Sequence, residues 1–124
     1  MRTVDIPLIP SRIERIREIT VNCDNQLEEL AAFEAYFVDA LQPPFAAIWR
    51  DPDEPGHAEP VTVLGLAEVD ERRGVLLKVR RGPRERRLLS EQVWAEDRHS
   101  PNGVILDDYR YWVERLGGLT PGYG

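Results

Sequence analysis

The residues most able to do chemistry are carboxylates, and they are concentrated in one part of the chain. Residues 24 to 71 hold twelve aspartates and glutamates and a single cation, Arg50. Carboxylate oxygens suit calcium, because this hard cation accepts about six to eight oxygen ligands in irregular geometry. Crowded carboxylates also raise one another's pKa unless a cation neutralises them, which favours recruiting such an ion. The alternative interpretation is that these acids only keep exposed loops soluble.

One acidic stretch, Asp51-Pro52-Asp53-Glu54-Pro55-Gly56, partly matches the calcium loop of an EF-hand. It has the opening Asp-x-Asp and a glycine at the sixth position. The twelfth position holds Thr62 in place of the glutamate that binds the ion with both oxygens. We therefore expect any calcium site in this chain to differ from an EF-hand.

Nucleophilic catalysis would need a Cys–His pair in contact within about 3 Å. The candidates are Cys23 at a predicted helix boundary and His57 and His99 in two separate loops. Nothing in their spacing brings them together, and one cysteine with two scattered histidines does not form a recognisable zinc site. The sequence predicts a protein that is not an enzyme.

Two helices are predicted before residue 43. Ser11 and Glu14 have the spacing of a capping box, which predicts a helix from about residue 11 to 20. Asn25 and Glu28 repeat this signal before a second helix, which Pro43-Pro44 ends.

A third helix is predicted from Ser100-Pro101, an N-cap followed by proline, to the C-terminal cap at Gly117-Gly118. Helical spacing places Tyr109, Trp112 and Leu116 on its core face. The residues expected to point away from the core are Asp107, Asp108 and Tyr111.

The middle of the chain predicts β-strands. Runs of β-branched residues and leucines cover residues 45–49, 60–69, 75–79 and 86–93, with turn residues between them. The order helix, helix, strands, helix predicts an α+β fold with a small antiparallel sheet that is SH3-like or otherwise strongly curved. A length of 124 residues fits one domain spanning residues 1–124.

The net charge of −6 is unevenly distributed, since residues 72 to 98 hold nine cations and four anions. Five of these cations, Arg80, Arg81, Arg84, Arg86 and Arg87, flank a predicted hairpin turn and could contact phosphates. An isoelectric point of about 4.9 and the absence of interleaved exposed aromatics argue against nucleic acid. We interpret the hairpin as pairing with acids across the sheet.

No apolar run approaches the roughly 20 residues that cross a bilayer, and no signal-type segment begins the sequence. The single cysteine cannot form an internal disulfide. These features predict a cytoplasmic protein without a membrane segment.

Four segments, taken in order, resemble a known family. They are Phe33 to Ala47 (FEAYFVDALQPPFAA), Val61 to Leu66 (VTVLGL), Arg86 to Leu89 (RRLL) and Ser100 to Val113 (SPNGVILDDYRYWV). Together they are similar to the small bacterial calcium-binding proteins of the CcbP type, first known from cyanobacteria. The resemblance covers about residues 12–117, and it departs from the family at Leu88-Leu89-Ser90, where a Pro-Leu pair is common.

The resemblance implies an α+β domain that binds Ca²⁺ through surface carboxylates, as a cytoplasmic buffer or sensor without catalysis. The first candidate ligands, which lie within the matched motifs, are Asp39, Asp107 and Asp108. The second candidates are Glu68, Asp70 and Glu71. Asp108 could instead pair with Arg110. The alternative function is a protein-interaction module whose acidic face meets a basic partner and needs no metal.

Overall fold

The computed structural model describes residues 10–118 of the chain. These residues form helices at both ends of a run of strands, as an α+β fold requires. The elements are α1 (Pro10–Ile19), α2 (Gln26–Ala40), β1 (Phe45–Arg50), β2 (Ala58–Asp70), β3 (Gly74–Arg81), β4 (Arg84–Leu89), the 3₁₀-helix η1 (Ser90–Gln92), β5 (Val93–Ala95) and α3 (Pro101–Arg115). None of the helices in this part of the chain is long and apolar enough to cross a membrane.

The caps that the sequence predicts start α2 and α3, whereas α1 begins at Pro10, one residue before its predicted cap Ser11. The side chain of Asn25 accepts a hydrogen bond from the N–H of Glu28 at 2.9 Å and starts α2. The hydroxyl of Ser100 accepts one from the N–H of Gly103 at 3.0 Å and starts α3. Gly117 lies just past α3 with a φ of +76°, a backbone conformation that glycine adopts without strain. The three predicted helices are confirmed.

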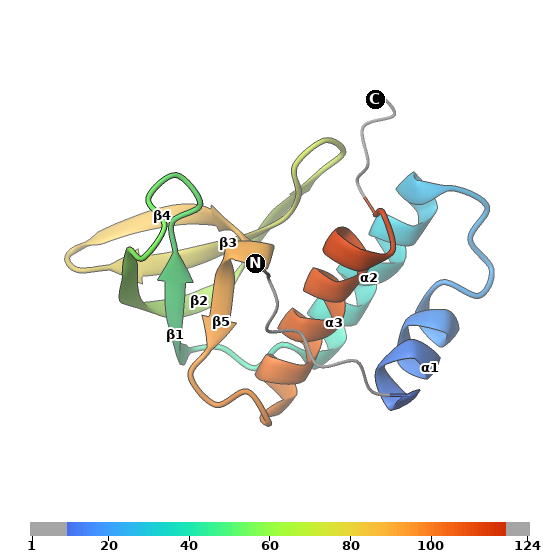
Figure 1. Ribbon diagram of the computed structural model, residues 1–124, viewed down its shortest axis with the longest axis horizontal. Helices are drawn as coiled ribbons and strands as arrows, with labels where there is room; N and C mark the ends of the chain where they lie inside the picture. Colours follow the sequence, from blue (N-terminus) through green and yellow to red (C-terminus); the bar gives the residue numbers. More distant parts are fainter. Residues whose placement is uncertain (1–9, 119–124) are drawn as a thin grey trace.

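The five strands form one antiparallel sheet in the order β4-β3-β2-β1-β5. The long strand β2 carries two register shifts against β3, near Gly65 and near Glu68, and such bulges bend a strand. Figure 1 shows the sheet on one side of the molecule and the three helices on the other. The core lies between them, where Phe33 of α2 and Tyr109 of α3 are fully buried together with Val63 of β2.

One predicted strand is broken. Residues 86–93 were expected to form a single strand, but β4 ends at Leu89 and η1 separates it from β5. The reason is the pairing pattern, since β4 lies against β3 whereas β5 lies against β1, on the opposite edge of the sheet. One straight strand cannot pair with both, so the chain turns through η1 with Ser90 fully buried.

The predicted faces of α3 are confirmed only in part, because Tyr109 and Trp112 lie in the core as expected but other residues do not follow the prediction. Asp107, Asp108 and Tyr111 were expected to point away from the core, but their exposed fractions are 4%, 0% and 7%. Leu116, expected in the core, is 51% exposed. The helix contacts α1, α2, η1 and β5, so almost its whole circumference is covered. The buried acids are tolerated because arginines neutralise them, as their contacts show.

Candidate functional site

The carboxylate of Asp108 lies at the junction of the three helices. Its Oδ1 accepts hydrogen bonds from Nε of Arg12 at 2.7 Å and from Nη2 of Arg15 at 2.9 Å, both on α1. Its Oδ2 accepts from Nε of Arg15 at 2.8 Å and from the hydroxyl of Tyr36 on α2 at 3.0 Å. Burial raises the pKa of Tyr36, and the charge of Asp108 raises it further, so this hydroxyl keeps its proton and donates. Each oxygen of Asp108 therefore accepts two hydrogen bonds from the protein.

Asp107 is held in a similar way. Its Oδ2 lies 2.9 Å from Nη2 of Arg98, and its Oδ1 accepts a short hydrogen bond from Arg110 one turn along α3. Nη2 of Arg12 lies 3.9 Å from Oδ2. Burial lowers the pKa of Arg110 to about 10, and the hydrogen bond with Asp107 opposes this shift, so the guanidinium stays charged at neutral pH.

We call one set of groups the helix-junction network: the carboxylates of Asp107 and Asp108, the four arginines 12, 15, 98 and 110, and the hydroxyl of Tyr36. In it, guanidinium groups take the neutralising role that the sequence assigned to calcium. The network links α1 and α2 to α3 and joins α3 to the segment before it. The pairing with Arg110 that the sequence proposed for Asp108 is made by Asp107 instead.

The remaining predicted ligands lie elsewhere. Asp39 is exposed near the C-terminal end of α2, and Glu68, Asp70 and Glu71 lie at the turn between β2 and β3. The six predicted residues therefore occupy three separate places. Among residues 10–118, no three or more His, Cys, Asp or Glu side chains are grouped so that they could hold a metal ion by themselves.

At the β2–β3 turn, two of the three acids already have partners. Glu68 pairs with Arg87 at 2.7 Å and with Arg73 at 3.3 Å. Asp70 accepts hydrogen bonds from the backbone N–H groups of Arg72 and Arg73, both at 2.8 Å, and these bonds lower its pKa. Glu71 is exposed and makes no hydrogen bond or ion pair within the described residues.

Glu71 nevertheless lines the same hollow as a second acid that the sequence did not single out. It lines a hollow of about 220 Å³ together with Glu34 of α2, and the other walls are Leu27, Leu30, Ala31 and Val69. Glu34 is also exposed and without an ion pair in this part of the structure. Glu34 lies 37 positions before Glu71, so the sequence does not indicate that the two acids share a hollow. The only sequence signal for Glu34 was its place in the acidic block. The two carboxylates supply hard oxygens of the kind calcium takes, and backbone carbonyls and water commonly complete such a shell.

The acidic loop that partly matched an EF-hand joins two strands, β1 and β2, whereas an EF-hand loop joins two helices. Its side chains serve the loop itself, since Oδ1 of Asp51 accepts the backbone N–H of Asp53 at 2.9 Å. At the start of β2, Glu59 is bonded to Arg81 and lies 2.9 Å from Nε2 of His57. The bond with Arg81 is the main cause that lowers the pKa of Glu59 to about 2.

The three residues considered for nucleophilic catalysis lie in three different loops. Cys23 follows α1, His57 precedes β2 and His99 precedes α3, and no hydrogen bond or ring contact joins any two of them in the described structure. Burial raises the pKa of the Cys23 thiol, and nearby acids raise it further, which disfavours a reactive thiolate.

Comparison with known proteins identifies the class. The model of the CcbP family, described as calcium binding, matches residues 11–113. The chain is similar in fold to a structure described as a calcium-binding protein in the calcium-binding form, with a TM-score of 0.72 and 21% identity over 94% of this chain and 98% of that one. It is also similar to the crystal structure of Anabaena CcbP, with a TM-score of 0.70 and 24% identity over 91% of this chain and 95% of that one. None of the curated sequences compared with the chain matches it.

The matched segment includes all three helices almost completely and the whole sheet. The chain belongs to the CcbP family of calcium-binding proteins, which confirms the resemblance seen in its sequence. Ca²⁺ is the ion that this family assignment indicates.

Proposed function

We propose that this chain is a cytoplasmic calcium buffer or sensor that binds Ca²⁺ through exposed carboxylates and carries out no catalysis. The observation that most supports this proposal is the family match over residues 11–113. The acidic block of residues 24–71 adds to it, because it supplies many oxygen ligands and only one competing cation.

Three of the exposed carboxylates that calcium could reach at little cost are Glu71 and Asp39 from the predicted set, and Glu34. None of them makes an ion pair within residues 10–118, so binding does not require an arginine to leave. Glu34 and Glu71 also line the same hollow. We place the principal site at this pair.

The other predicted ligands would have to exchange a partner for calcium. Glu68 and Asp70 lie at the surface, where an ion pair contributes about 0–1 kcal/mol, so calcium can compete for them. Asp107 and Asp108 are buried, and uncoupling a buried charge from its partner costs about 3–5 kcal/mol. Calcium binding by Asp107 and Asp108 therefore requires the helix-junction network to open.

Calorimetric titration of the chelator-stripped full chain with Ca²⁺, and with Mg²⁺ as control, tests the function. The site is tested by repeating the titration on Glu34→Gln with Glu71→Gln. A matched control is Asp53→Asn with Glu54→Gln, which removes the same charge from two exposed acids in the β1–β2 loop. Asp107→Asn with Asp108→Asn is informative only after circular dichroism shows that it folds.

Saturable heat that is selective for Ca²⁺, weakened by the first double variant and unchanged in the matched control, would support function and site together. If the Asp107/Asp108 variant folds and is the only variant that weakens the binding heat, the calcium site lies at the helix junction. Calcium at about one hundred times its Kd should also stabilise the protein by about 2.7 kcal/mol. If Ca²⁺ produced no binding heat and no shift in Tm, the calcium function of this chain would be overturned. The protein-interaction module would then remain as the function.

A buffer and a sensor differ in how far the effect of calcium spreads. A sensor changes conformation on binding, whereas a buffer changes little beyond the ligands. Amide hydrogen exchange with and without Ca²⁺ distinguishes them, because a sensor alters protection in elements that do not touch the ion.

A further inference from the structure

Strand β4 is an open edge of the sheet. It pairs with β3 alone, whereas the opposite edge strand β5 packs against α3. The first four residues of β4, Arg84 to Arg87, are all exposed, although neighbouring residues of a strand point to opposite faces. The outer part of β4 therefore has its side chains and one edge in solvent, although Val79 of β3, the partner of Arg86, is buried. An edge strand presents a row of backbone N–H and C=O groups that another strand can pair with.

This hairpin is strongly basic. Residues 78–87 include six cations and one acid. Part of this charge is balanced within the chain, since Lys78 lies 3.6 Å from Glu85 and Arg81 is bonded to Glu59. Arg84 and Arg86 make no ion pair within the described residues. These two residues are two positions apart, so their side chains leave the same face of β4.

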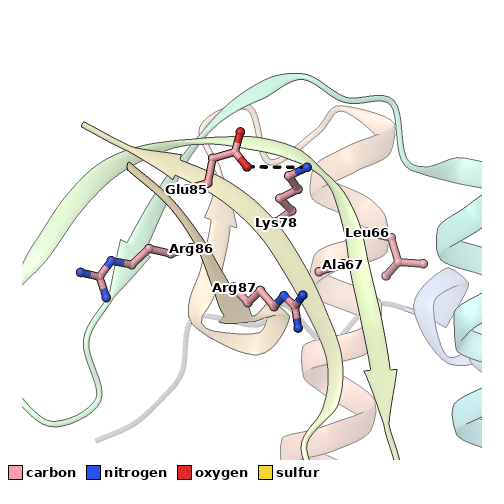
Figure 2. A pocket seen from close by; sticks show the side chains of 6 residues that line it. All are labelled: Leu66, Ala67, Lys78, Glu85, Arg86 and Arg87. Atoms are coloured by element: carbon pink, nitrogen blue, oxygen red, sulfur yellow. Dashed lines mark ion pairs between the residues drawn. The ribbon is translucent and has the colours of Figure 1, made fainter. Parts of the chain in front are cut away.

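A hollow lies beside the hairpin. A hollow of about 520 Å³ is lined by Lys78, Glu85, Arg86 and Arg87 and by the apolar residues Leu66 and Ala67 of β2. Figure 2 shows Lys78 and Glu85 paired on one side of β4, with Arg86 and Arg87 pointing in opposite directions from it. Three cations, one acid and two apolar residues thus line a hollow beside an open strand edge.

The chemistry of this edge restricts its occupant. A second copy is a poor occupant, because residues 84–87 hold three arginines and one glutamate, so β4 against β4 brings like charges close together, which is destabilising. Nucleic acid is disfavoured by the overall charge of −6 and by the absence of aromatic residues among those that line the hollow. An extended acidic segment of another protein fits both the open edge and the arginines of β4. Its backbone can pair with the edge, and its carboxylates can form ion pairs with the arginines.

We propose that β4 is a docking edge for an extended acidic segment of a partner protein, which adds to the sheet as a further strand. Arg84 and Arg86 meet carboxylates on one face of the added strand. The hollow beside β4, which Leu66 and Ala67 line, accepts a small apolar or polar side chain of the added strand. This edge is separate from Glu34 and Glu71, the pair at which we place the principal calcium site.

The test uses the full chain and a fluorescein-labelled octapeptide of alternating glutamate and threonine, with binding measured by fluorescence anisotropy. A glutamate–proline octapeptide carries the same charges but lacks half of the backbone N–H donors. Arg84→Gln with Arg86→Gln removes the unpaired cations. Arg17→Gln with Arg115→Gln is the matched control, because it removes two exposed cations from helices α1 and α3.

We expect the glutamate–threonine peptide to bind and added salt to weaken the binding. The Arg84/Arg86 variant should lose about tenfold in affinity, whereas the Arg17/Arg115 control should keep its affinity. Amide hydrogen exchange should show added protection in β4. Equal binding of the proline peptide would overturn strand addition, and equal binding by the Arg84/Arg86 variant would overturn the docking edge. Tighter binding of a single-stranded oligonucleotide than of the peptide would replace the protein partner with nucleic acid.

Discussion

Asp108 of α3 and Arg12 of α1 are separated by 96 positions in the sequence and are joined by a 2.7 Å contact between Oδ1 and Nε. Their side chains are 0% and 4% exposed, so the contact is almost free of solvent. Few apolar residues link α1 to the rest of the fold, Ile16 being the fully covered one on this helix. The ion pair therefore helps to fix the position of α1.

The first prediction concerns Asp108→Asn. This change keeps the shape of the side chain but leaves Arg12 and Arg15 without their principal counter-charge. We expect the free energy of unfolding to fall by about 3–5 kcal/mol, the cost of breaking a buried pair. Urea denaturation in the presence of a chelator, followed by circular dichroism, measures this loss.

The control for that experiment is Asp39→Asn, the same chemical change at an exposed position. It should alter stability by no more than about 0.5 kcal/mol. A similarly small effect of Asp108→Asn would show that the helix-junction network does not hold the fold together.

The second prediction concerns Glu91 in η1. Its Oε1 is buried without a hydrogen-bond partner in the described residues, and burial raises the pKa of this carboxyl to about 7. Glu114 of α3 raises the pKa further, whereas Arg110 opposes the shift. The proton on Glu91 is therefore held more tightly in the folded protein than in the unfolded chain, whose ordinary pKa is 4.5.

The sign of the effect follows from these two values. Below a pH of about 4.5 both states hold the proton and Glu91 costs nothing, whereas above about pH 7 its buried charge lowers stability by about 3 kcal/mol. Glu91→Gln should therefore stabilise the protein at pH 8 and change little at pH 4.5, as measured by urea denaturation at each pH. The exposed Glu96→Gln is the control, and an equal effect of Glu91→Gln at both pH values would contradict the prediction.

The third prediction concerns the pair Glu59 and His57. The hydrogen bond with Glu59 is the main cause that raises the pKa of His57 above its ordinary value of 6.5. Glu59→Gln should therefore lower the pKa of His57 toward that value. Titration of the His57 ring proton by NMR measures the change, and the resonance of His99 in another loop provides the reference. An unchanged titration of His57 would show that the contact does not persist in solution.

The fourth prediction concerns Gly103 at the start of α3. A Cβ at this position would lie 2.5 Å from the carbonyl oxygen of Arg98, which is backbone and cannot rotate away. Gly103→Ala should destabilise the protein by about 1–3 kcal/mol, although alanine favours helices. Thermal denaturation tests this, with Arg115→Ala at the exposed end of the same helix as control. A stabilised Gly103→Ala protein would show that the loop before α3 can move.

Much of the fold could be read from local patterns. The caps at Asn25 and Ser100 start α2 and α3 because a side-chain oxygen satisfies a free N–H within three residues of it, and this relation is written in the sequence. The strands follow similarly from their β-branched runs and turn residues. The acidic block and the basic hairpin were visible as composition, because charge is carried by each residue wherever it lies.

Contacts between distant segments were decided only by the tertiary structure. Asp107 and Asp108 belong to a motif that suggested exposed ligands, but packing of α1, α2, η1 and β5 around α3 buries them beside arginines. The pairing of β5 with β1 breaks a run that looked like one strand, and the hollow shared by Glu34 and Glu71 exists because a helix and a turn meet. Local sequence encodes the conformation and charge of each segment. Which charges neutralise one another depends on which segments the core brings together, and burial then decides whether a carboxylate meets arginine or solvent.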